Sequence, residues 1–395
     1  MSKSTVYILV GGGSGGHLAP LIPIAQSIKK LDSGSTIIHI GQSGDKLNEM
    51  LASEPSIDKF HTIIAGKFRR YNGESFLYRI FDIKTNLLNL RDFFKFLIGI
   101  IQSYFLLKRL RPNIIFTKGG YVCAPVGIAG RLTNVPYITH DSDAIVSLAH
   151  RIISKSAKLH LTAMPVKYYE QYQESKTRQV GIPVRLEYVQ LSDSKKQKLK
   201  EELRFNKSSK ILLVVGGGLG AKNINSAILA GSQKLLLDQD VIIVHITGHK
   251  LYDGVISEYK KLDVDKNRVV CLPFTNKLHQ YSSVADVVIS RAGATNMAEF
   301  SAQAKACIIV PNPLLAGGHQ LKNAEVFEKS SSAIIVHEAD LEEKLVNTAV
   351  ELLNDKEKQK ELSSNLREGA VLDAGNKIAE ILVEYAGRKV NLQNL

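Results

Sequence analysis

Short apolar runs alternate with amphipathic, helix-like stretches along most of the chain. In the first half, the runs typical of buried strands are Val6–Val10, Thr36–Ile40, Asn113–Thr117, Tyr137–Thr139 and Leu159–Thr162. Helical patterns lie between them, for example at Leu18–Leu31 and Val122–Leu132. Strands that alternate with helices are the signature of βαβ units, so this half is predicted to form a parallel sheet.

The same order restarts at Lys210–Val215, an apolar run followed by a glycine-rich turn and a helical pattern over Asn223–Leu237. Further strand-like runs are Val241–Thr247, Val269–Leu272, Val287–Ser290, Cys307–Val310 and Ala333–Val336. The chain has 395 residues, and single cores stop growing at about 250–300 residues. We therefore predict an α/β protein with two doubly wound domains in tandem.

The domain boundary is predicted near Gly181–Leu191, where Gly181-Ile182-Pro183 interrupts regular structure. It separates a first domain, residues 1–185, from a second, residues 186–374. Ser192–Leu203 is predicted to be a polar, lysine-rich surface helix. The pattern of Ile378–Val390 is helical, which makes the segment from about 375 to 395 a candidate to pack back on the first domain.

The formal net charge of +13 attracts nucleic acid, anionic lipid and phosphorylated substrates alike. No RNA-binding, zinc-finger or helix-turn-helix pattern accompanies the charge, so nucleic acid is not a predicted partner. The cysteines Cys123, Cys271 and Cys307 form no CxxC pair. This spacing argues against a disulfide framework or a zinc site and fits a reducing cytosol.

No membrane-spanning or secretory segment is predicted. The N-terminal apolar run, Thr5 to Val10, meets a glycine-rich turn at once, which indicates a strand rather than a secretory signal. The most apolar later segment, Phe93 to Leu107, is interrupted by Lys95. It is also shorter than the ~20 residues that cross a bilayer.

Much of the positive charge falls between Lys67 and Arg111, interleaved with aromatic residues such as Phe81 and Phe93. Basic and apolar side chains together suit an anionic bilayer surface, with the apolar groups entering the headgroup region. The alternative is a long core helix flanked by solvated charges, which fits Leu97–Leu107. We predict a membrane-facing role for the part of this stretch that precedes Leu97.

Each predicted domain begins with a strand, a glycine-rich turn and a helix. The turns are Gly11 to His17 and Gly216 to Ala221, and both satisfy the dinucleotide-binding spacing. Such turns admit a phosphate close to backbone N–H groups and to a helix N-terminus. The next strands end in Ile40-Gly41-Gln42 and Ile246-Thr247-Gly248, without the acid that holds a ribose. A nicotinamide or flavin oxidoreductase is therefore the weaker interpretation.

A series of motifs, in order along nearly the whole chain, resembles the MurG family of N-acetylglucosaminyltransferases in glycosyltransferase family 28. The motifs are Gly12-Gly13-Ser14-Gly15-Gly16-His17, Gly119-Gly120-Tyr121-Val122, Gly181-Ile182-Pro183-Val184-Arg185, Gly216-Gly217 with Gly220-Ala221, Ser290-Arg291-Ala292-Gly293-Ala294 with Glu299, and His319-Gln320 with Asn323-Ala324. The resemblance implies the GT-B fold, in which two Rossmann-like domains face a cleft.

The resemblance also implies a reaction and a location. N-acetylglucosamine is transferred, with inversion, from UDP-N-acetylglucosamine to the 4-hydroxyl of lipid I, the undecaprenyl-diphosphate-linked N-acetylmuramyl-pentapeptide. The product is lipid II, used in peptidoglycan synthesis. The expected location is peripheral, at the cytoplasmic face of the cell membrane.

Inverting transfer needs a base for the attacking hydroxyl and positive potential for the departing UDP. His17 is the first candidate for the base and Asp143 the second. By resemblance, the donor-binding residues are Ser14, Gly15, Arg185, Gly218, Leu219, Phe274, Ala294, Thr295, Asn296, Glu299, His319 and Gln320. The acceptor-binding residues are Gly16, His17, Gly119, Gly120, Tyr121, His140 and Asp143.

Roles within the donor set also follow from the resemblance. Arg185 is expected to face the diphosphate and Glu299 the ribose hydroxyls. Backbone near Phe274 is expected to contact uracil, and residues 294–296 lie by the phosphates. His319 and Gln320 are expected to hold sugar hydroxyls.

Two departures from the family pattern leave alternatives open. Gly218-Leu219 stands where the family has Ser-Gln, and His140-Asp141-Ser142-Asp143 where it has His-Glu-Gln-Asn. A related UDP-sugar transferase acting on another lipid, such as a diacylglycerol, is one alternative. A degenerate nucleotide-sugar-binding subunit is the other. Asp141-Ser142-Asp143 spells a metal-binding DxD, but helix dipoles and arginine can supply the charge, so no obligatory metal or cofactor is predicted.

Overall fold

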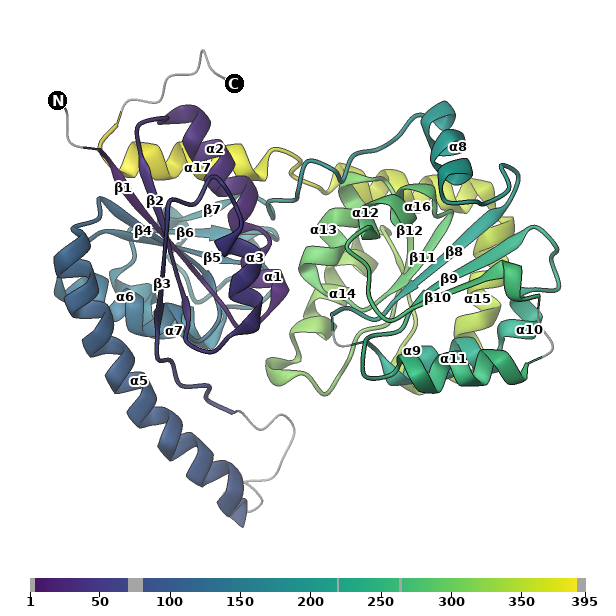
Figure 1. Cartoon of the computed structure of the whole chain (residues 1–395), viewed down its shortest axis with the longest axis horizontal. Coiled ribbons are helices and arrows are strands. Elements are labelled where there is room, and N and C mark those ends of the chain that lie inside the picture. The colour runs from purple at the N-terminus through teal and green to yellow at the C-terminus, as the bar shows by residue number, and fades with distance from the viewer. Residues whose placement is uncertain (1–3, 70–80, 219, 263–264, 389–395) are drawn as a thin grey trace. The chain divides into compact units, whose positions relative to one another are not determined.

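The computed structural model describes residues 4–69, 81–218, 220–262 and 265–388. The chain divides into two compact units, Met1–Arg185 with Val371–Leu395, and Leu186–Ala370. Each unit has its own parallel sheet covered by helices (Figure 1). Together the two Rossmann-like sheets confirm the predicted α/β fold class.

The sheet of the first unit has seven parallel strands in the order β3-β2-β1-β4-β5-β6-β7. The strands are β1 (Val6–Gly11), β2 (Thr36–Gln42), β3 (Lys59–Ile63), β4 (Ile114–Gly119), β5 (Tyr137–Asp141), β6 (Leu159–Thr162) and β7 (Thr177–Gln179). The strand order reverses between β1 and β4, and ligands of such sheets bind beyond the carboxyl ends of the strands at this switch point. The edge strands β3 and β7 were not predicted, because both are short and partly exposed.

Two helices follow β1 where one was predicted, because Pro20 separates α1 from α2. The helices of this unit are α1 (Gly15–Leu18), α2 (Leu21–Leu31), α3 (Glu49–Ala52), α5 (Ile83–Leu110), α6 (Cys123–Leu132), α7 (Leu148–Ile153) and α17 (Ala374–Tyr385). The C-terminal helix α17 lies on α2, where Ser27 Oγ donates to Asn376 Oδ1 at 2.7 Å. Ile378 and Leu382 of α17 are buried in the same cluster as Ile24.

Helix α5 is 28 residues long, and few of its residues are buried. It has close contacts at Asp92, whose carbonyl oxygen would lie 1.8 Å from a Cβ added at Gly66, and at Gly99, where an added Cβ would lie 2.3 Å from the carbonyl oxygen of Ile64. The core-helix interpretation of Leu97–Leu107 is right for one face only: Leu107 belongs to the core, whereas Ile101 and Phe105 are exposed. Figure 1 shows α5 extending away from the sheet of its unit.

Among the residues that the structure describes, no helix combines the length and the apolar character needed to cross a bilayer.

The second unit repeats the arrangement with six parallel strands in the order β10-β9-β8-β11-β12-β13. The strands are β8 (Lys210–Val215), β9 (Val241–Ile246), β10 (Val269–Leu272), β11 (Val287–Ser290), β12 (Ala306–Ile309) and β13 (Ile334–Ile335). The order reverses between β8 and β11, so the switch point again follows the first strand and its glycine-rich turn.

The helices of the second unit are α8 (Asp193–Glu202), α9 (Lys222–Ala230), α10 (Ser232–Leu235), α11 (Tyr252–Lys261), α12 (Leu278–Val284), α13 (Ala294–Ala302), α14 (His319–Lys329), α15 (Val346–Asn354) and α16 (Lys356–Glu368). The single helix predicted over Asn223–Leu237 is interrupted at Gly231. A Cβ there would lie 2.3 Å from Val346 Cγ2, so the close approach of α15 requires glycine.

Candidate functional site

The first glycine loop, at the carboxyl end of β1, holds the His17 imidazole in one orientation. His17 Nδ1 lies 2.9 Å from the carbonyl oxygen of Gly12. A carbonyl only accepts, so Nδ1 carries the proton and Nε2 presents a lone pair. Burial, then the positive charge of Lys118, lower the pKa of His17. At neutral pH the side chain therefore has the charge and tautomer that a general base needs.

The second glycine loop packs directly against the first. Gly119 (φ +132°) and Gly120 (φ +88°) have backbone conformations that other residues rarely adopt. A Cβ at Gly119 would lie 2.9 Å from His17 Nε2, and one at Gly120 would lie 2.2 Å from the Gly12 carbonyl oxygen. The structure thus brings together His17, Gly119 and Gly120, which the sequence had assigned to the acceptor.

A pocket of about 190 Å³ opens beside the two loops. His17, Gly120 and Tyr121 line one part of it, and Phe68 and Phe96 line another. The remaining lining is Gly66, Ala124, Ser147, Leu148, Ala149 and Ile152. Because the walls are largely apolar, the pocket suits a ligand with an apolar portion next to the His17 imidazole.

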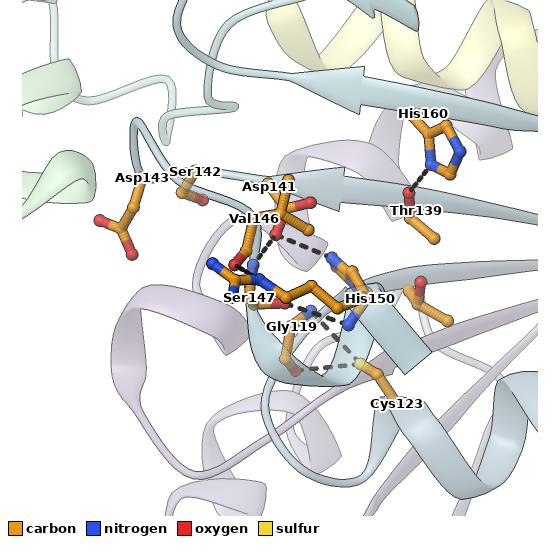
Figure 2. A network of polar contacts seen from close by, with 12 residues as sticks. Gly119, Cys123, Thr139, Asp141, Ser142, Asp143, Val146, Ser147, His150 and His160 are labelled. Carbon is orange, nitrogen blue, oxygen red and sulfur yellow. Dashed lines mark hydrogen bonds and ion pairs between the residues drawn. The ribbon is translucent and has the colours of Figure 1, made fainter. Parts of the chain in front are cut away.

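A buried ion pair lies behind the second glycine loop (Figure 2). His150 Nδ1 donates to Asp141 Oδ1 at 2.9 Å, and Tyr172 donates its hydroxyl to Asp141 Oδ2 at 2.5 Å. Burial alone would raise the pKa of Asp141, but His150 and the hydrogen bonds hold it well below its usual range. Burial opposes the charge of His150, yet Asp141 outweighs it and raises the pKa of His150 to about 9.

Cys123 connects this ion pair with the loop. The Gly119 N–H donates to Cys123 Sγ at 3.3 Å, and the thiol donates to the Gly119 carbonyl at 3.1 Å. His150 in turn interacts with Cys123. Figure 2 shows Gly119, Cys123, Asp141 and His150 as one cluster. Sequence reasoning missed His150 and Tyr172, because no motif marks a partner that comes from another element.

His140, for which an acceptor contact was predicted, lies at the end of β5. Its side chain is fully buried, and Nε2 is 2.8 Å from the Gly181 carbonyl oxygen. Burial and then Lys118 lower the pKa of His140 to about 3, so it donates as a neutral imidazole. The side chain joins the end of β5 to Gly181. The predicted acceptor contact of His140 stays a prediction.

The two carboxylates of Asp141-Ser142-Asp143 point apart (Figure 2). Asp141 faces His150, whereas Asp143 is partly exposed on the opposite side. Within the described ranges, no group of three or more His, Cys, Asp or Glu is placed to hold a metal ion. The absence of an obligatory metal or cofactor stays a prediction.

Other residues predicted in the first unit lie at the edges of these loops. Ser14, Gly15 and Gly16 are partly exposed where α1 begins. Arg185 is partly buried at the end of the unit, four residues after Gly181. The predicted donor contacts of Ser14, Gly15 and Arg185 stay predictions.

The third glycine loop leads from β8 to α9 in the second unit. Gly217 (φ +85°) and Gly220 (φ +77°) give it its shape, and a Cβ at Gly220 would lie 2.1 Å from the Thr247 carbonyl oxygen. Gly218 is exposed, with open space where a side chain would project. Leu219, the other departure in this loop, lies outside the described residues.

Helix α13 begins at Ala294, immediately after the turn at the end of β11. Its first turn contains Ala294, Thr295 and Asn296, so their N–H groups belong to a helix N-terminus, which favours phosphate. Glu299 is buried one turn further along the same helix. This placement fits the predicted roles beside the phosphates and the ribose, without testing them.

Gln320 and Asn323, from the last of the family motifs, each form a hydrogen bond with a neighbouring loop. Gln320 Oε1 accepts from the Asn312 N–H at 2.9 Å, and Asn323 donates to the Ala292 carbonyl at 2.9 Å. His319 is partly exposed at the start of α14. Phe274 is exposed beyond β10 and its ring stacks on that of His249.

A further ion pair that the sequence did not suggest joins the turn after β11 to the start of α9, two segments next to the predicted donor-binding residues. Arg291, in the turn after β11, donates to Glu338 and to the Val310 carbonyl. Asn223, at the start of α9, donates to the same carboxylate at 2.7 Å. Glu338 lies 47 residues from Arg291, so only the fold reveals that it contacts both segments.

Comparisons with known proteins agree with this geometry. Residues 7–162 match the glycosyltransferase family 28 N-terminal domain, and residues 211–379 match the family 28 C-terminal domain. The chain is 32% identical over 380 residues to the UDP-N-acetylglucosamine–N-acetylmuramyl-(pentapeptide) pyrophosphoryl-undecaprenol N-acetylglucosamine transferase of Caldicellulosiruptor saccharolyticus, covering 96% of this chain and 97% of the relative. The Clostridium novyi enzyme of the same name is also 32% identical, over 392 residues, covering 98% and 99%.

Solved structures show the same fold. The crystal structure of Acinetobacter baumannii MurG superposes with a TM-score of 0.72 at 21% identity, covering 97% of this chain and all of that one. A complex of Staphylococcus aureus MnaA with UDP superposes with a TM-score of 0.68 at 10% identity, covering 98% and 100%.

Two Rossmann-like units, each with a glycine-rich turn at its switch point, define this chain as a glycosyltransferase of the GT-B class. More narrowly, it belongs to the UDP-N-acetylglucosamine–N-acetylmuramyl-(pentapeptide) pyrophosphoryl-undecaprenol N-acetylglucosamine transferase family, the MurG family. The predicted family resemblance is confirmed.

Proposed function

We propose that this chain transfers N-acetylglucosamine from UDP-N-acetylglucosamine to the 4-hydroxyl of lipid I, with inversion, to form lipid II. The names of relatives that match over nearly their whole length support this donor and acceptor. The observation that carries the proposal is His17, whose Nε2 lone pair lies against the second glycine loop and beside an apolar pocket. A neutral base next to space for an amphipathic acceptor is what this transfer requires.

In the proposed reaction, His17 Nε2 accepts the proton of the 4-hydroxyl while that oxygen attacks C1 of the donor sugar. The bond between C1 and the UDP oxygen breaks, and inversion follows from attack on the opposite face. Within the second unit, the N-terminus of α13 and the amides of the third glycine loop are the groups suited to stabilise the negative charge of a diphosphate.

Incubation of purified protein with radiolabelled UDP-N-acetylglucosamine tests the proposal directly. Label is expected to move to a lipid I analogue and not to diacylglycerol, because both acceptor-side glycine loops carry the family motif and the relatives are named for that acceptor. Transfer to diacylglycerol instead would refute the acceptor assignment. UDP binding without transfer to either lipid would support a degenerate nucleotide-sugar-binding subunit.

We further propose that α5 docks the protein on an anionic bilayer. Large apolar residues are exposed along the helix at Ile83, Leu87, Leu90, Phe93, Phe94, Leu97, Ile98, Ile101 and Phe105. The exposed charges beside them are basic, including Lys84, Lys108 and Arg109. An exposed apolar stripe with basic flanks is typical of a surface that enters the headgroup region of anionic lipid. Residues 70–80, which belong to the segment predicted to face the membrane, lie outside the described residues.

Substitution of two of these residues tests the docking. Leu90 and Phe94 are 54% and 56% exposed, so the Leu90→Glu/Phe94→Glu variant is expected to fold normally. It is expected to bind phosphatidylglycerol vesicles about tenfold or more weakly in a sedimentation assay, because apolar burial is lost and negative charge is added. Leu237→Glu, on an exposed apolar residue of the second unit, serves as the matched control. Undiminished sedimentation of the double variant would exclude α5 as the docking surface.

We also propose a peripheral location at the cytoplasmic face of the membrane. The proposed docking surface on α5 supports the membrane contact. The cysteines Cys123, Cys271 and Cys307 form no disulfide in the described part of the chain, which fits a reducing compartment.

A further inference from the structure

Asp45 is a carboxylate beside the first glycine loop to which no role has been assigned. It lies in the loop that follows β2, a strand that ends at Gln42. Asp45 Oδ2 accepts from the Gly13 N–H at 2.9 Å. Asp45 Oδ1 accepts from the Leu47 N–H at 3.0 Å and so caps the short 3₁₀ helix Lys46–Asn48. One side chain thus joins the loop after β2 to the first glycine loop.

The Gly13 N–H belongs to the same peptide group as the Gly12 carbonyl. That carbonyl accepts from His17 Nδ1 at 2.9 Å. The peptide bond is trans, so its N–H and its C=O point to opposite sides. The Gly12–Gly13 peptide therefore lies between two side chains: it donates to the Asp45 carboxylate and accepts from the His17 imidazole.

The two glycines do not fix the orientation of this peptide by themselves. Neither has a Cβ, and Gly13 already has a positive φ of 79°, so little intrinsic strain opposes rotation of the peptide plane. Rotation would turn the Gly13 N–H toward His17 Nδ1 in place of the Gly12 carbonyl. The imidazole would then accept at Nδ1 and carry its proton on Nε2, the atom that a base needs free.

We propose that Asp45 is a positioning residue for the proposed transfer: by holding the Gly13 N–H, its carboxylate fixes the peptide whose carbonyl keeps the proton of His17 on Nδ1. This inference rests on the proposed function of His17 as the base. Asp45 acts through the peptide and contacts no reacting atom. It is the first acid after β2, and it is turned to the glycine loop, where it takes an N–H that such a turn can otherwise offer to a phosphate.

The tautomer of His17 tests this arrangement without any need for transfer. In protein labelled with ¹⁵N-histidine, NMR should show His17 with its proton on Nδ1, and the His17→Asn variant assigns the signals by their absence. Asp45→Ala removes the acceptor of the Gly13 N–H, so the Nε2–H tautomer is expected to appear. An unchanged tautomer in Asp45→Ala would overturn the proposal.

Transfer kinetics test the same arrangement in the working enzyme. Asp45→Ala is expected to lower kcat roughly 10–100-fold, the change that corresponds to loss of a hydrogen bond to a charged group. The KM for UDP-N-acetylglucosamine should change little. In the His17→Ala background the same substitution should have no further effect, because Asp45 acts only through the imidazole. An equal loss in both backgrounds would show an independent role and refute the inference.

Two further variants separate this role from the capping of the 3₁₀ helix. Asp45→Ser keeps a hydroxyl that can cap the Leu47 N–H but lacks a second oxygen for Gly13, so it should behave as Asp45→Ala does. It also keeps the test valid if Asp45→Ala fails to fold. Asp265 caps another 3₁₀ helix, in the second unit, by accepting from the Asn267 N–H at 2.9 Å. Asp265→Ala should leave both kcat and the tautomer unchanged.

The controls also define the outcomes that count against Asp45. Wild-type kcat and tautomer in Asp45→Ser, or a similar loss of transfer in Asp265→Ala, would attribute the effect to capping and overturn the proposal. If the wild-type protein transfers no sugar to the lipid I analogue, the proposed function is wrong, but the tautomer of His17 still reports on Asp45. If it transfers sugar and the Asp45 variants match it in kcat and tautomer, only this inference is wrong.

Discussion

Replacement of His17 by alanine is expected to lower the rate of sugar transfer by about 10²–10⁴-fold, the usual contribution of a general base. UDP binding should stay near the wild-type value, because the predicted UDP-binding loops lie mainly in the second unit. The measurement is kcat for transfer to a lipid I analogue, beside UDP affinity by calorimetry.

His17→Asn is the matched variant. Its side-chain amide can donate to the Gly12 carbonyl as Nδ1 does, but it supplies no basic nitrogen. The asparagine variant should therefore be nearly as inactive as the alanine variant while the loop keeps its shape. Full activity of either variant would refute the assignment of His17 as the base.

Disruption of the buried Asp141–His150 ion pair is expected to have the largest effect on stability. Both partners are buried, and removal of one leaves an uncompensated charge in the protein interior. The His150→Leu variant should lose about 3–5 kcal/mol of unfolding free energy. Lys29→Met, which breaks the more exposed Lys29–Asp58 pair of the same unit, should cost less than about 1 kcal/mol. Urea denaturation measures both.

The pH dependence of this loss follows from the two pKa values. The pKa of His150 is raised from 6.5 to about 9, so its stabilisation is complete below 6.5 and lost as pH rises through 9. The pKa of Asp141 is held below its usual value of 3.8, so its stabilisation is present above 3.8 and lost in stronger acid. The difference in unfolding free energy between wild type and His150→Leu should be largest between pH 3.8 and pH 6.5 and should shrink toward pH 9. A difference that widens as pH rises from 6.5 to 9 would contradict the ion pair.

Local sequence was sufficient to predict the strands around both glycine loops. These strands are continuous apolar runs, because a parallel sheet is buried on both faces. The exposed edge strands β3 and β7 lack that signal. The break at Gly231 was also missed, because it depends on Val346 of α15.

Helix α5 shows a different limit. Its apolar residues follow a helical spacing that is equally compatible with a core face and with an exposed stripe, since periodicity reports a shared face and not what covers it. Only the tertiary structure, in which Ile101 and Phe105 are exposed while Gly99 is buried, revealed that much of the apolar side faces outward.

By itself, the sequence determined the two-domain α/β class, the position of the glycine loops and the family, because glycines, buried strands and motif order are all local features. It also singled out His17. The tertiary structure alone decided which groups surround that imidazole. Lys118, Asp143 and His150, whose charges act on His17, come from separate elements that the sheet topology brings together. Burial then sets their charges, and burial is a property of the fold that no local pattern contains.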